Sequence, residues 1–411
     1  MPQHQYELAG LTVLHMTQPV EGGVARVVMD LVRAQVGAGA RVVVASPSEP
    51  PGRPDRPGPA GTPGAPGAPG PLAAAVTAAG AEPVRWPARR SPGPALAREV
   101  AAAGRVLRAA RPDLLHLHSA KAGLAGRLAA RGALPTVFQP HAWSFEAVTG
   151  PAAGAALRWE RYAAARWTDL VLCVSEAERA TGRRQGVRAD WAVVPNGVDT
   201  ARFAPAADRA AVRAALPALC GLAPGAPLVV CVGRLCPQKG QDVLLRAWPD
   251  VAARLPGARL ALVGDGPDRD RLFRDAPPGV LLAGASADPG PWYQAADVVV
   301  QPSRWEGMAL APLEAMACGR PVVLTDVAGA RESLPPADTA GCVVPVADPP
   351  ALAAALLRLL TDPRLRTAAG ARALGRVRDR HDVRRAAAEV AALYGALLAL
   401  PRPYAVERVP R

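Results

Sequence analysis

Residues 297–324 read DVVVQPSRWEGMALAPLEAMACGRPVVL, and this stretch decides the fold class. The short, mostly apolar run from Asp297 to Gln301 predicts a buried strand. Pro312 suits the first turn of a helix, where its missing N–H costs nothing, and Gly319 with Pro321 ends that helix before the next apolar strand. The stretch is therefore a strand, a loop, a helix and a second strand.

The same alternation of short apolar runs and alanine-rich helical stretches continues along the chain. It is typical of parallel sheets that helices cover on both faces, so the predicted fold class is α/β with doubly wound sheets. A chain of 411 residues is too long for one ordinary core, and two domains are the natural expectation.

Two glutamates, Glu306 and Glu314, stand in this stretch with seven residues between them. The pattern places Glu306 in the loop and Glu314 in the first helical turn, where both could accept hydrogen bonds from sugar hydroxyls. The backbone amides after Glu306 would face an anionic ligand, namely those of Gly307, Met308, Ala309 and Leu310. The alternatives are a Glu314 that only balances the helix dipole and a Glu306 that is solvated.

A second loop of this kind follows the apolar strand from Leu228 to Val232 and precedes the helical stretch from Asp242 to Trp248. Gly233 opens the loop, and Arg234 and Lys239 add two cations. Exposed amides and the positive end of a helix dipole attract phosphate oxygens, so the combination predicts a diphosphate-binding loop. The alternative is a surface loop with two solvated charges.

The chain contains only two lysines, Lys239 in that loop and Lys121 in another. The strand predicted from Asp113 to His118 ends in His118, Ser119 and Lys121, and a helix follows. By the same argument of a cation beside a helix start, a second phosphate-sized anion could bind there. The alternative for Lys121 is a solvated lysine at a helix start.

A pair of glycines, Gly22 and Gly23, lies between a strand predicted from Leu11 to His15 and an amphipathic helix predicted from Val24 to Val36. Two glycines at a helix start permit close approach of the backbone to a ligand. The alternative is an ordinary tight turn. His116, inside the neighbouring predicted strand, is better explained as a core histidine than as a catalytic one.

With these segments in view, the chain resembles the family-4 retaining glycosyltransferases, which have the two-domain GT-B fold. The matching segments follow the family's order over nearly the whole chain: Glu21 to Gly23, His116 to Gly123, Pro140 to Trp143, Val194 to Asp199, Gly233 to Gly240, Gly264 to Gly266, and Glu306 to Glu314. The block of paired glutamates is the most specific of them. Ala309 is a departure, because many members have glycine there, and it bears on which donor fits.

The resemblance implies a role for each matching residue. Arg234 and Lys239 would bind the donor diphosphate, Glu314 the nucleotide ribose and Glu306 the donor sugar, with His141 beside the sugar on the opposite domain. The residues expected to take part in catalysis are thus His141, Glu306, Arg234 and Lys239. The expected donor contacts are Gly22, Gly23, Gly233, Arg234, Lys239, Gly307, Met308, Ala309, Leu310 and Glu314. The expected acceptor contacts are His118, Ser119 and Lys121.

The implied activity is retaining transfer of a hexosyl unit from a nucleoside-diphosphate sugar, UDP- or GDP-linked, to an acceptor hydroxyl. No metal and no other cofactor is expected. The segments look most like those of members that build cell-surface polysaccharides on polyprenyl-diphosphate carriers, so the expected acceptor is a lipid-linked glycan. The alternatives are a nucleotide-sugar epimerase of the same fold, a non-catalytic binding protein, and transfer to an inositol phosphate or a natural product.

The expected organisation has four parts. Residues 1–195 form an acceptor-side Rossmann-like domain with a flexible Pro/Gly loop at 47–71, which is too rich in proline and glycine to form a core. Residues 196–226 are a linker, and residues 227–380 form the nucleotide-sugar-binding Rossmann-like domain. Residues 381–411 carry a helix, predicted from Val383 to Leu400, that crosses back to the first domain.

The chain carries a formal charge of +13 and has a pI near 10.4, which favours anionic partners. Nucleic acid is not expected, because the arginines are dispersed rather than interleaved with aromatic residues. Phosphorylated substrates and an anionic membrane surface remain, although a GC-rich genome would also enrich arginine.

Neither a signal peptide at Met1 to Gly10 nor a bilayer-spanning run is apparent, so the expected location is cytoplasmic, with peripheral attachment to the inner face of the plasma membrane as an open alternative. Six scattered cysteines without metal-ligand spacing predict a reducing compartment and no structural zinc. Cys231, Cys318 and Cys342 are expected in the core.

Overall fold

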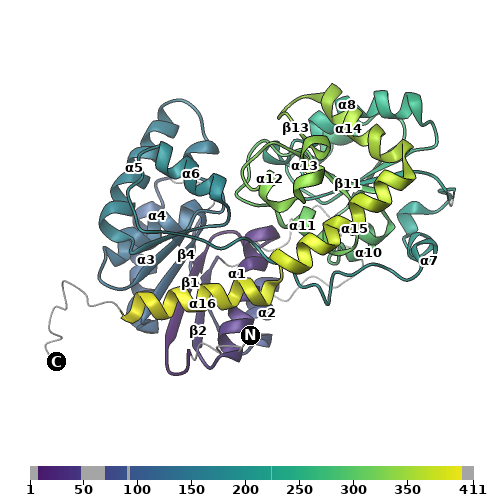
Figure 1. Cartoon of the computed structure of the whole chain (residues 1–411). Helices are drawn as coiled ribbons and strands as arrows, with labels where there is room; N and C mark the ends of the chain where they lie inside the picture. Colours follow the sequence, from purple (N-terminus) through teal and green to yellow (C-terminus); the bar gives the residue numbers. More distant parts are fainter. Residues whose placement is uncertain (1–7, 48–69, 90–92, 224, 400–411) are drawn as a thin grey trace, which may run out of the picture.

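The computed structural model describes residues 8–47, 70–89, 93–223 and 225–399, which form two α/β domains side by side (Figure 1). The Pro/Gly loop predicted at 47–71 lies almost entirely outside the described residues, and so does the predicted end of the last helix at Leu400. The α/β class predicted from the sequence is confirmed.

The first domain is built on a seven-stranded parallel sheet in the order β3-β2-β1-β4-β5-β6-β7. Its central strands are almost wholly buried, which explains their continuous apolar runs. The strands are β1 (Thr12–Thr17), β2 (Arg41–Ser46), β3 (Glu82–Arg85), β4 (Leu114–His118), β5 (Thr136–Gln139), β6 (Leu170–Cys173) and β7 (Trp191–Val193). The helices are α1 (Gly22–Gly37), α2 (Pro71–Ala78), α3 (Leu96–Ala110), α4 (Ser119–Ala130), α5 (Pro151–Trp167) and α6 (Glu176–Arg184).

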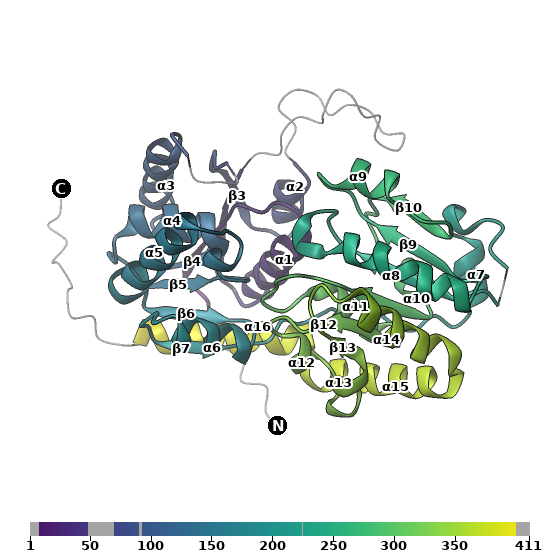
Figure 2. The same cartoon turned by 90° about the horizontal axis from the view of Figure 1, so that it is seen from above.

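The second domain is built on a six-stranded parallel sheet in the order β10-β9-β8-β11-β12-β13 (Figure 2). The strands are β8 (Leu228–Val232), β9 (Arg259–Val263), β10 (Val280–Gly284), β11 (Val298–Gln301), β12 (Val322–Thr325) and β13 (Val343–Val344). The helices are α8 (Gln241–Arg254), α9 (Arg269–Arg274), α10 (Gly290–Ala295), α11 (Leu310–Ala317), α12 (Ala330–Ser333), α13 (Pro336–Cys342), α14 (Pro349–Thr361) and α15 (Pro363–Arg380). Cys231, Cys318 and Cys342 are buried in this domain, as predicted.

The elements predicted from the sequence are present, with small changes of length. The strand, helix and strand predicted within 297–324 are β11, α11 and β12. The helix predicted to end at Trp248 instead continues through Pro249 to Arg254. Continuing the helix past Pro249 buries Val251 completely in its last turn, which offsets part of the cost of the proline.

Strand order reverses at the middle of each sheet, between β1 and β4 in the first domain and between β8 and β11 in the second. In open parallel sheets, ligands bind beyond the carboxyl ends of the strands at such a reversal. The predicted motif residues Gly22, His118, Arg234 and Glu306 lie at the carboxyl ends of these four strands or in the segments that follow them. The topology therefore places all four residues where a ligand site is expected.

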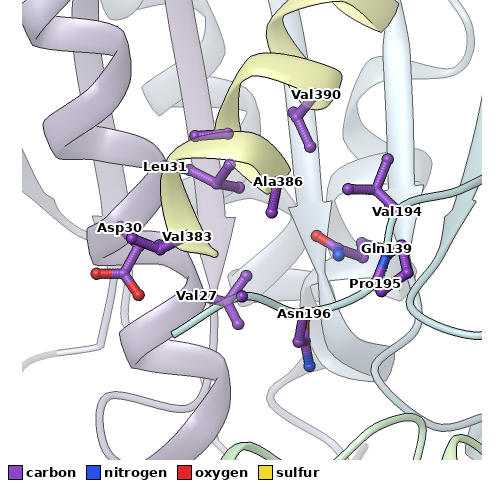
Figure 3. Close-up of a pocket in the computed structure, with 12 residues that line it drawn as sticks. Val27, Asp30, Leu31, Gln139, Val194, Pro195, Asn196, Val383, Ala386 and Val390 are labelled. Carbon is purple, nitrogen blue, oxygen red and sulfur yellow. The ribbon is translucent and has the colours of Figure 1, made fainter. Parts of the chain in front are cut away.

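The chain crosses between the domains twice, and the two crossings lie side by side. Val198 bridges to Asp382, and the ring nitrogen Nδ1 of His381 lies 3.0 Å from the carbonyl oxygen of Asn196. α16 (Val383–Ala399) then runs back along α1 and across one face of the first domain (Figure 1). A small cavity of about 30 Å³ remains where the start of α16 meets α1, and Gln139 and Asn196 are among the residues that line it (Figure 3).

The segment predicted as a linker, residues 196–226, contains α7 (Arg209–Ala214). Arg213 on this helix donates to Asp297 at 2.8 Å and to the carbonyl oxygen of Ala295 at 2.9 Å. Both partners belong to the second domain, so α7 packs as part of that domain. The domain limits at 195, 226 and 380 stay an interpretation of the sequence.

Two glycines of α15 give a matched test of how this helix packs. A Cβ at Gly370 would lie 2.4 Å from the carbonyl oxygen of Gly319, whereas a Cβ at Gly375 would meet no atom within 4 Å. We expect Gly370→Ala to lower the free energy of unfolding by about 1–2 kcal/mol through overpacking. Gly375→Ala should raise it by about 0.5–1 kcal/mol through helix propensity.

Urea unfolding of both variants, followed by circular dichroism, measures these changes. Equal stabilisation by the two substitutions would contradict the close packing of α15 against the end of α11.

Candidate active site

The two loops of the second domain that carry predicted donor residues meet through an ion pair. Lys239 Nζ lies 2.5 Å from Glu306 Oε1, and Ser303 Oγ donates to the same oxygen at 2.8 Å. Gly240, which precedes α8, has φ +66°, and a Cβ there would lie 2.0 Å from the carbonyl oxygen of Pro302. Glycine is therefore required at 240 for the two loops to approach this closely.

The other predicted cation, Arg234, is exposed and has no ion-pair partner within the described part of the chain. Its loop is held by packing against the loop after β9, because a Cβ at Gly264 would lie 2.0 Å from the carbonyl oxygen of Gly233. Gln241 Nε2 also donates to the carbonyl oxygen of Arg234 at 3.0 Å. The backbone is thus fixed, while the guanidinium is open to an anionic ligand.

Glu314 is buried at a junction of the two domains. Its Oε2 accepts a hydrogen bond from the Tyr293 hydroxyl at 2.7 Å, and its Oε1 accepts from Arg26 of α1 in the first domain. Burial and the Glu314 carboxylate raise the pKa of Tyr293 well above its usual value, so the hydroxyl stays protonated and donates.

The prediction that Glu314 lies in the first helical turn is wrong. α11 begins at Leu310 after the extended residue Ala309, so Glu314 is one turn further along. The helix dipole acts mainly within the first turn, so balancing it no longer accounts for this carboxylate. Its two partners, Tyr293 and Arg26, hold it instead.

The backbone after Glu306 lies directly against the first domain. The carbonyl oxygen of Gly307 accepts from Ser175 Oγ at 3.0 Å, and that of Met308 accepts from Asn196 Nδ2 at 2.7 Å. A Cβ at Gly307 would lie 2.8 Å from Glu178 Oε1. Glycine at 307 therefore lets the donor loop reach the opposite domain.

The predicted glycine pair lies opposite α11, although only one of its members touches the donor loop. A Cβ at Gly23 would meet the Leu310 side chain at 3.8 Å, whereas a Cβ at Gly22 would meet nothing within 4 Å. Gly22 has φ +77°, which glycine adopts without strain. The start of α1 and the start of α11 therefore face each other across the domains.

His141 stands in a strained turn at the end of β5. His141 has φ +54° and Ala142 has φ +91°, values that cost about 1–3 kcal/mol per residue and persist only because the surroundings impose them. The turn is held by Glu178, whose Oε1 accepts from the Ala142 N–H at 2.6 Å and whose carbonyl oxygen accepts from Trp143 Nε1 at 2.8 Å. Burial lowers the pKa of His141 to about 3, so its imidazole is neutral at physiological pH.

The predicted acceptor residues are held inside the first domain. Lys121 Nζ lies 2.5 Å from Glu99 Oε2, and both side chains are almost completely buried. The alternative of a solvated Lys121 is therefore wrong, and contact with an acceptor phosphate would require the ammonium to leave Glu99. His118 is buried and contacts His141, and Ser119 has φ +69° at the start of α4.

Three residues of the site gave no signal in the sequence. Arg26 is one of many arginines, and Glu178 and Tyr293 lie outside every predicted motif. Their roles depend on contacts between segments that are distant in the chain, such as Arg26 with Glu314. Local spacing carries no information about such contacts.

Buried histidines also gather beneath the site. One ring nitrogen from each of His15, His116 and His118 lies within 4.8 Å of the others, which is the kind of grouping that can hold a metal ion. Two of these nitrogens, His15 Nδ1 and His118 Nε2, already lie 2.9 Å apart in a hydrogen bond to each other. The expected independence from metal stays a prediction.

The buried carboxyl of Glu178 should make stability depend on pH. Burial raises its pKa from 4.5 to about 7. The folded chain therefore keeps this proton up to about pH 7, whereas the unfolded chain loses it near pH 4.5. The carboxyl's contribution to the free energy of unfolding is complete below pH 4.5 and falls by roughly 3 kcal/mol as the pH rises to 7.

Urea unfolding between these pH values should therefore show a flatter dependence for Glu178→Gln than for the unsubstituted chain. Glu176→Gln, an exposed neighbour on α6, is the matched control and should keep the original slope. An unchanged slope in Glu178→Gln would mean that this carboxyl titrates normally.

Two family models match the chain. Residues 21–202 match Glycosyltransferase Family 4, and residues 226–362 match Glycosyl transferases group 1. The lipopolysaccharide core biosynthesis mannosyltransferase LpsB of Rhizobium meliloti is 34% identical over 247 residues, which cover 56% of this chain and 69% of LpsB. The UDP-Gal:alpha-D-GlcNAc-diphosphoundecaprenol alpha-1,3-galactosyltransferase of Escherichia coli is 30% identical over 238 residues, which cover 55% of this chain and 60% of that protein.

The GDP-mannose-dependent alpha-(1-6)-phosphatidylinositol monomannoside mannosyltransferase of Mycolicibacterium smegmatis is 41% identical over 191 residues, which cover 43% of this chain. The match spans about half of the mycobacterial protein, 49% of its length.

Solved structures agree with the fold. Anabaena Alr3699/HepE in complex with UDP and glucose aligns with a TM-score of 0.75 at 22% identity, covering 94% of this chain and 100% of that one. Sucrose-phosphate synthase from Thermosynechococcus elongatus aligns with a TM-score of 0.76 at 24% identity, and the alignment covers 95% of this chain and 99% of that one. At such identities the likeness concerns the fold alone, the two-domain GT-B arrangement. The two family models and the similarity to LpsB show that the chain belongs to the glycosyltransferases, with a Family 4 region followed by a group 1 region.

Proposed function

We propose that this protein transfers a hexosyl unit, with retention, from a nucleoside-diphosphate sugar to a hydroxyl of a lipid-linked glycan in exopolysaccharide or cell-envelope synthesis. One observation carries the proposal. The loops at both strand reversals face each other, and they bring Lys239, Glu306 and Glu314 of one domain close to Gly23 and His141 of the other. A cation, two carboxylates and a neutral imidazole suit a diphosphate, hydroxyl groups and a sugar.

The charges define the work of each residue. Cleavage of the bond between sugar and diphosphate builds negative charge on the leaving phosphate, and Arg234 and Lys239 would stabilise that charge. Removing one such preorganised contact typically costs about 10²- to 10³-fold in rate. Lys239 is paired with Glu306 in this structure, so a diphosphate would compete for the ammonium and leave Glu306 to the donor sugar.

The donor is proposed to be UDP- or GDP-linked. The relatives include both kinds, since the mycobacterial protein is named as GDP-mannose-dependent and the E. coli protein as a UDP-galactose enzyme. Glu314 is the proposed ribose ligand, because its carboxylate already accepts two hydrogen bonds at the junction of the domains. A ribose diol could replace Arg26 as the second donor.

The acceptor is proposed to bind on the first domain near His118, Ser119 and Lys121. A relative from Kineococcus radiotolerans is named as a D-inositol 3-phosphate glycosyltransferase, so a small phosphorylated acceptor is the main alternative. A nucleotide-sugar epimerase stays open for a structural reason. An epimerase would use the donor site without an acceptor, and Lys121 does not count against it, because its ammonium lies on Glu99. Product analysis with and without a lipid-diphosphate acceptor separates these cases.

We further propose that the first domain meets an anionic membrane surface through arginines of α5 and the end of α6. No helix in the described part of the chain is long and apolar enough to cross a bilayer. A groove of about 1080 Å³ there is lined by the exposed residues Arg158, Arg161, Arg183 and Arg188, with Tyr162 beside them. Clustered arginines next to an exposed aromatic ring fit an interface with anionic headgroups.

Two carboxylate variants should separate nucleotide binding from chemistry. We expect Glu314→Gln to weaken binding of both the free nucleoside diphosphate and the nucleotide sugar by roughly 10- to 100-fold, through loss of a charged hydrogen-bond acceptor. Glu306→Gln should bind the free nucleoside diphosphate at least as tightly, because the uncharged amide competes less for Lys239, and should lose turnover.

A thermal-shift screen of UDP, GDP and their sugars, followed by calorimetry and a transfer assay, measures both effects. Equal weakening of free nucleotide by the two variants would contradict the separate roles of ribose and sugar ligand. Failure of every nucleotide sugar to stabilise the unsubstituted protein would count against the proposed function itself.

The membrane proposal predicts a site-specific charge effect. Replacing Arg158, Arg161 and Arg183 by glutamine should reduce co-sedimentation with anionic vesicles by about tenfold or more. Each arginine near an anionic surface contributes roughly 1 kcal/mol of binding free energy, and vesicles with roughly 30% anionic phospholipid provide such a surface. The matched control replaces three exposed arginines of the second domain, Arg254, Arg274 and Arg364, and removes the same charge. Equal loss in both triple variants would assign vesicle binding to net charge instead of this groove.

A further inference from the structure

A line of hydrogen-bonded side chains runs through the first domain from α1 to the site. Gln35 Oε1 lies 2.8 Å from His15 Nε2, His15 Nδ1 lies 2.9 Å from His118 Nε2, and His118 Nδ1 lies 3.1 Å from His141 Nε2. Gln35, His15 and His118 are buried, and His141 precedes Ala142, whose backbone nitrogen lies 3.0 Å from where a Cβ of Gly307 in the donor loop would be. We call these four residues the imidazole line.

The hydrogen bonds of this line are coupled. A neutral imidazole has one N–H donor and one bare acceptor nitrogen. A ring that uses both nitrogens therefore donates on one side and accepts on the other, so the direction of one hydrogen bond fixes the direction of the next. Burial lowers the pKa of His15 to about 4 and that of His118 well below its usual value, which keeps both rings neutral. The end of the line at Gln35 therefore sets the tautomer of every ring in it.

The amide of Gln35 is itself oriented by α16. Its Nε2 lies 3.5 Å from the Tyr394 hydroxyl, and that hydroxyl lies 2.5 Å from His116 Nδ1. An amide nitrogen only donates, so the tyrosine oxygen accepts from Gln35 and its proton goes to His116. Gln35 Oε1 then faces His15 and can only accept.

We infer that Gln35, His15 and His118 act as positioning residues that hold His141 in one tautomer, with the proton on Nε2 and a bare Nδ1. His15 donates from Nε2 to the amide, His118 donates from Nε2 to His15, and His141 donates from Nε2 to His118. The bare Nδ1 of His141 is the nitrogen left to accept a hydrogen bond from a hydroxyl of the bound sugar. The last statement rests on the proposed function, whereas the tautomer does not.

Two other functions fit the same residues less well. A proton relay would need an exit, and the line ends at an amide that neither gains nor loses a proton at ordinary pH. A metal ion held by His15, His116 and His118 would have to replace the hydrogen bond between His15 and His118, whose nitrogens are 2.9 Å apart.

The 411-residue chain offers a direct test, because its sequence has six histidines. With ¹⁵N-labelled histidine, long-range proton–nitrogen correlation spectra identify the protonated ring nitrogen of each residue, and single substitutions assign the signals. We expect His15, His118 and His141 as Nε2–H tautomers. His381 is the internal reference: its Nδ1 faces the carbonyl oxygen of Asn196, so it must carry the proton there.

Two substitutions at Gln35 test the cause. Gln35→Glu keeps an acceptor toward His15 and should leave the tautomer of His141 unchanged. Gln35→Leu removes it, and the His141 signals should then shift toward a mixture of tautomers. Once a donor and an acceptor that support transfer are known, Gln35→Leu should also lower kcat by about 2- to 10-fold. The reason is that part of the His141 population then loses its hydrogen bond to the sugar, a loss of about one hydrogen bond. The affinity for the nucleoside diphosphate should stay unchanged.

Each result has a separate meaning. An Nδ1–H tautomer of His141 in the unsubstituted protein, or no change in Gln35→Leu, would overturn the inference even if the enzyme transfers sugar. One bound zinc per chain by elemental analysis, with signals that move on chelation, would replace the imidazole line by a metal site. The expected tautomers without any transfer activity would leave the inference standing and count against the proposed function.

Discussion

The contact of Gly307 and Met308 with the first domain is the interaction on which the rest of the site depends. Two backbone carbonyls of the donor loop accept hydrogen bonds from Ser175 and Asn196, so the loop is fixed by the domain that it faces. Glu306 lies just before this contact and α11 begins just after it. The positions of both carboxylates therefore follow from how closely the two domains approach.

Much of the fold followed from local pattern. A glycine loop between an apolar strand and a helix predicted both donor loops, and the structure places them after β8 and β11, at the reversal of strand order. Such units are encoded within about 30 residues, which is the scale on which periodicity and caps act. The pairing of Lys239 with Glu306 was not predicted as a contact, but both residues were predicted for one site.

The remaining features depend on contacts that no local pattern encodes. Arg26 and Glu314 are 288 residues apart in the chain, and no local sequence pattern distinguishes Arg26 from the many other arginines. Lys121 was predicted from its place before a helix, but Glu99 on α3 draws its ammonium into the interior. Glu314 was placed one turn too early because the helix starts only at Leu310.

The paired crossings near Val198 and Asp382 have a mechanical consequence. A Cβ at Gly197 would lie 2.6 Å from Val383 Cα, so the two crossing segments are in contact at this point. Because both covalent links between the domains pass through one place, a change in the relative orientation of the domains has to pivot there. Such a pivot would separate Arg26 on α1 from Glu314 on α11, so the ion pair between them opposes it.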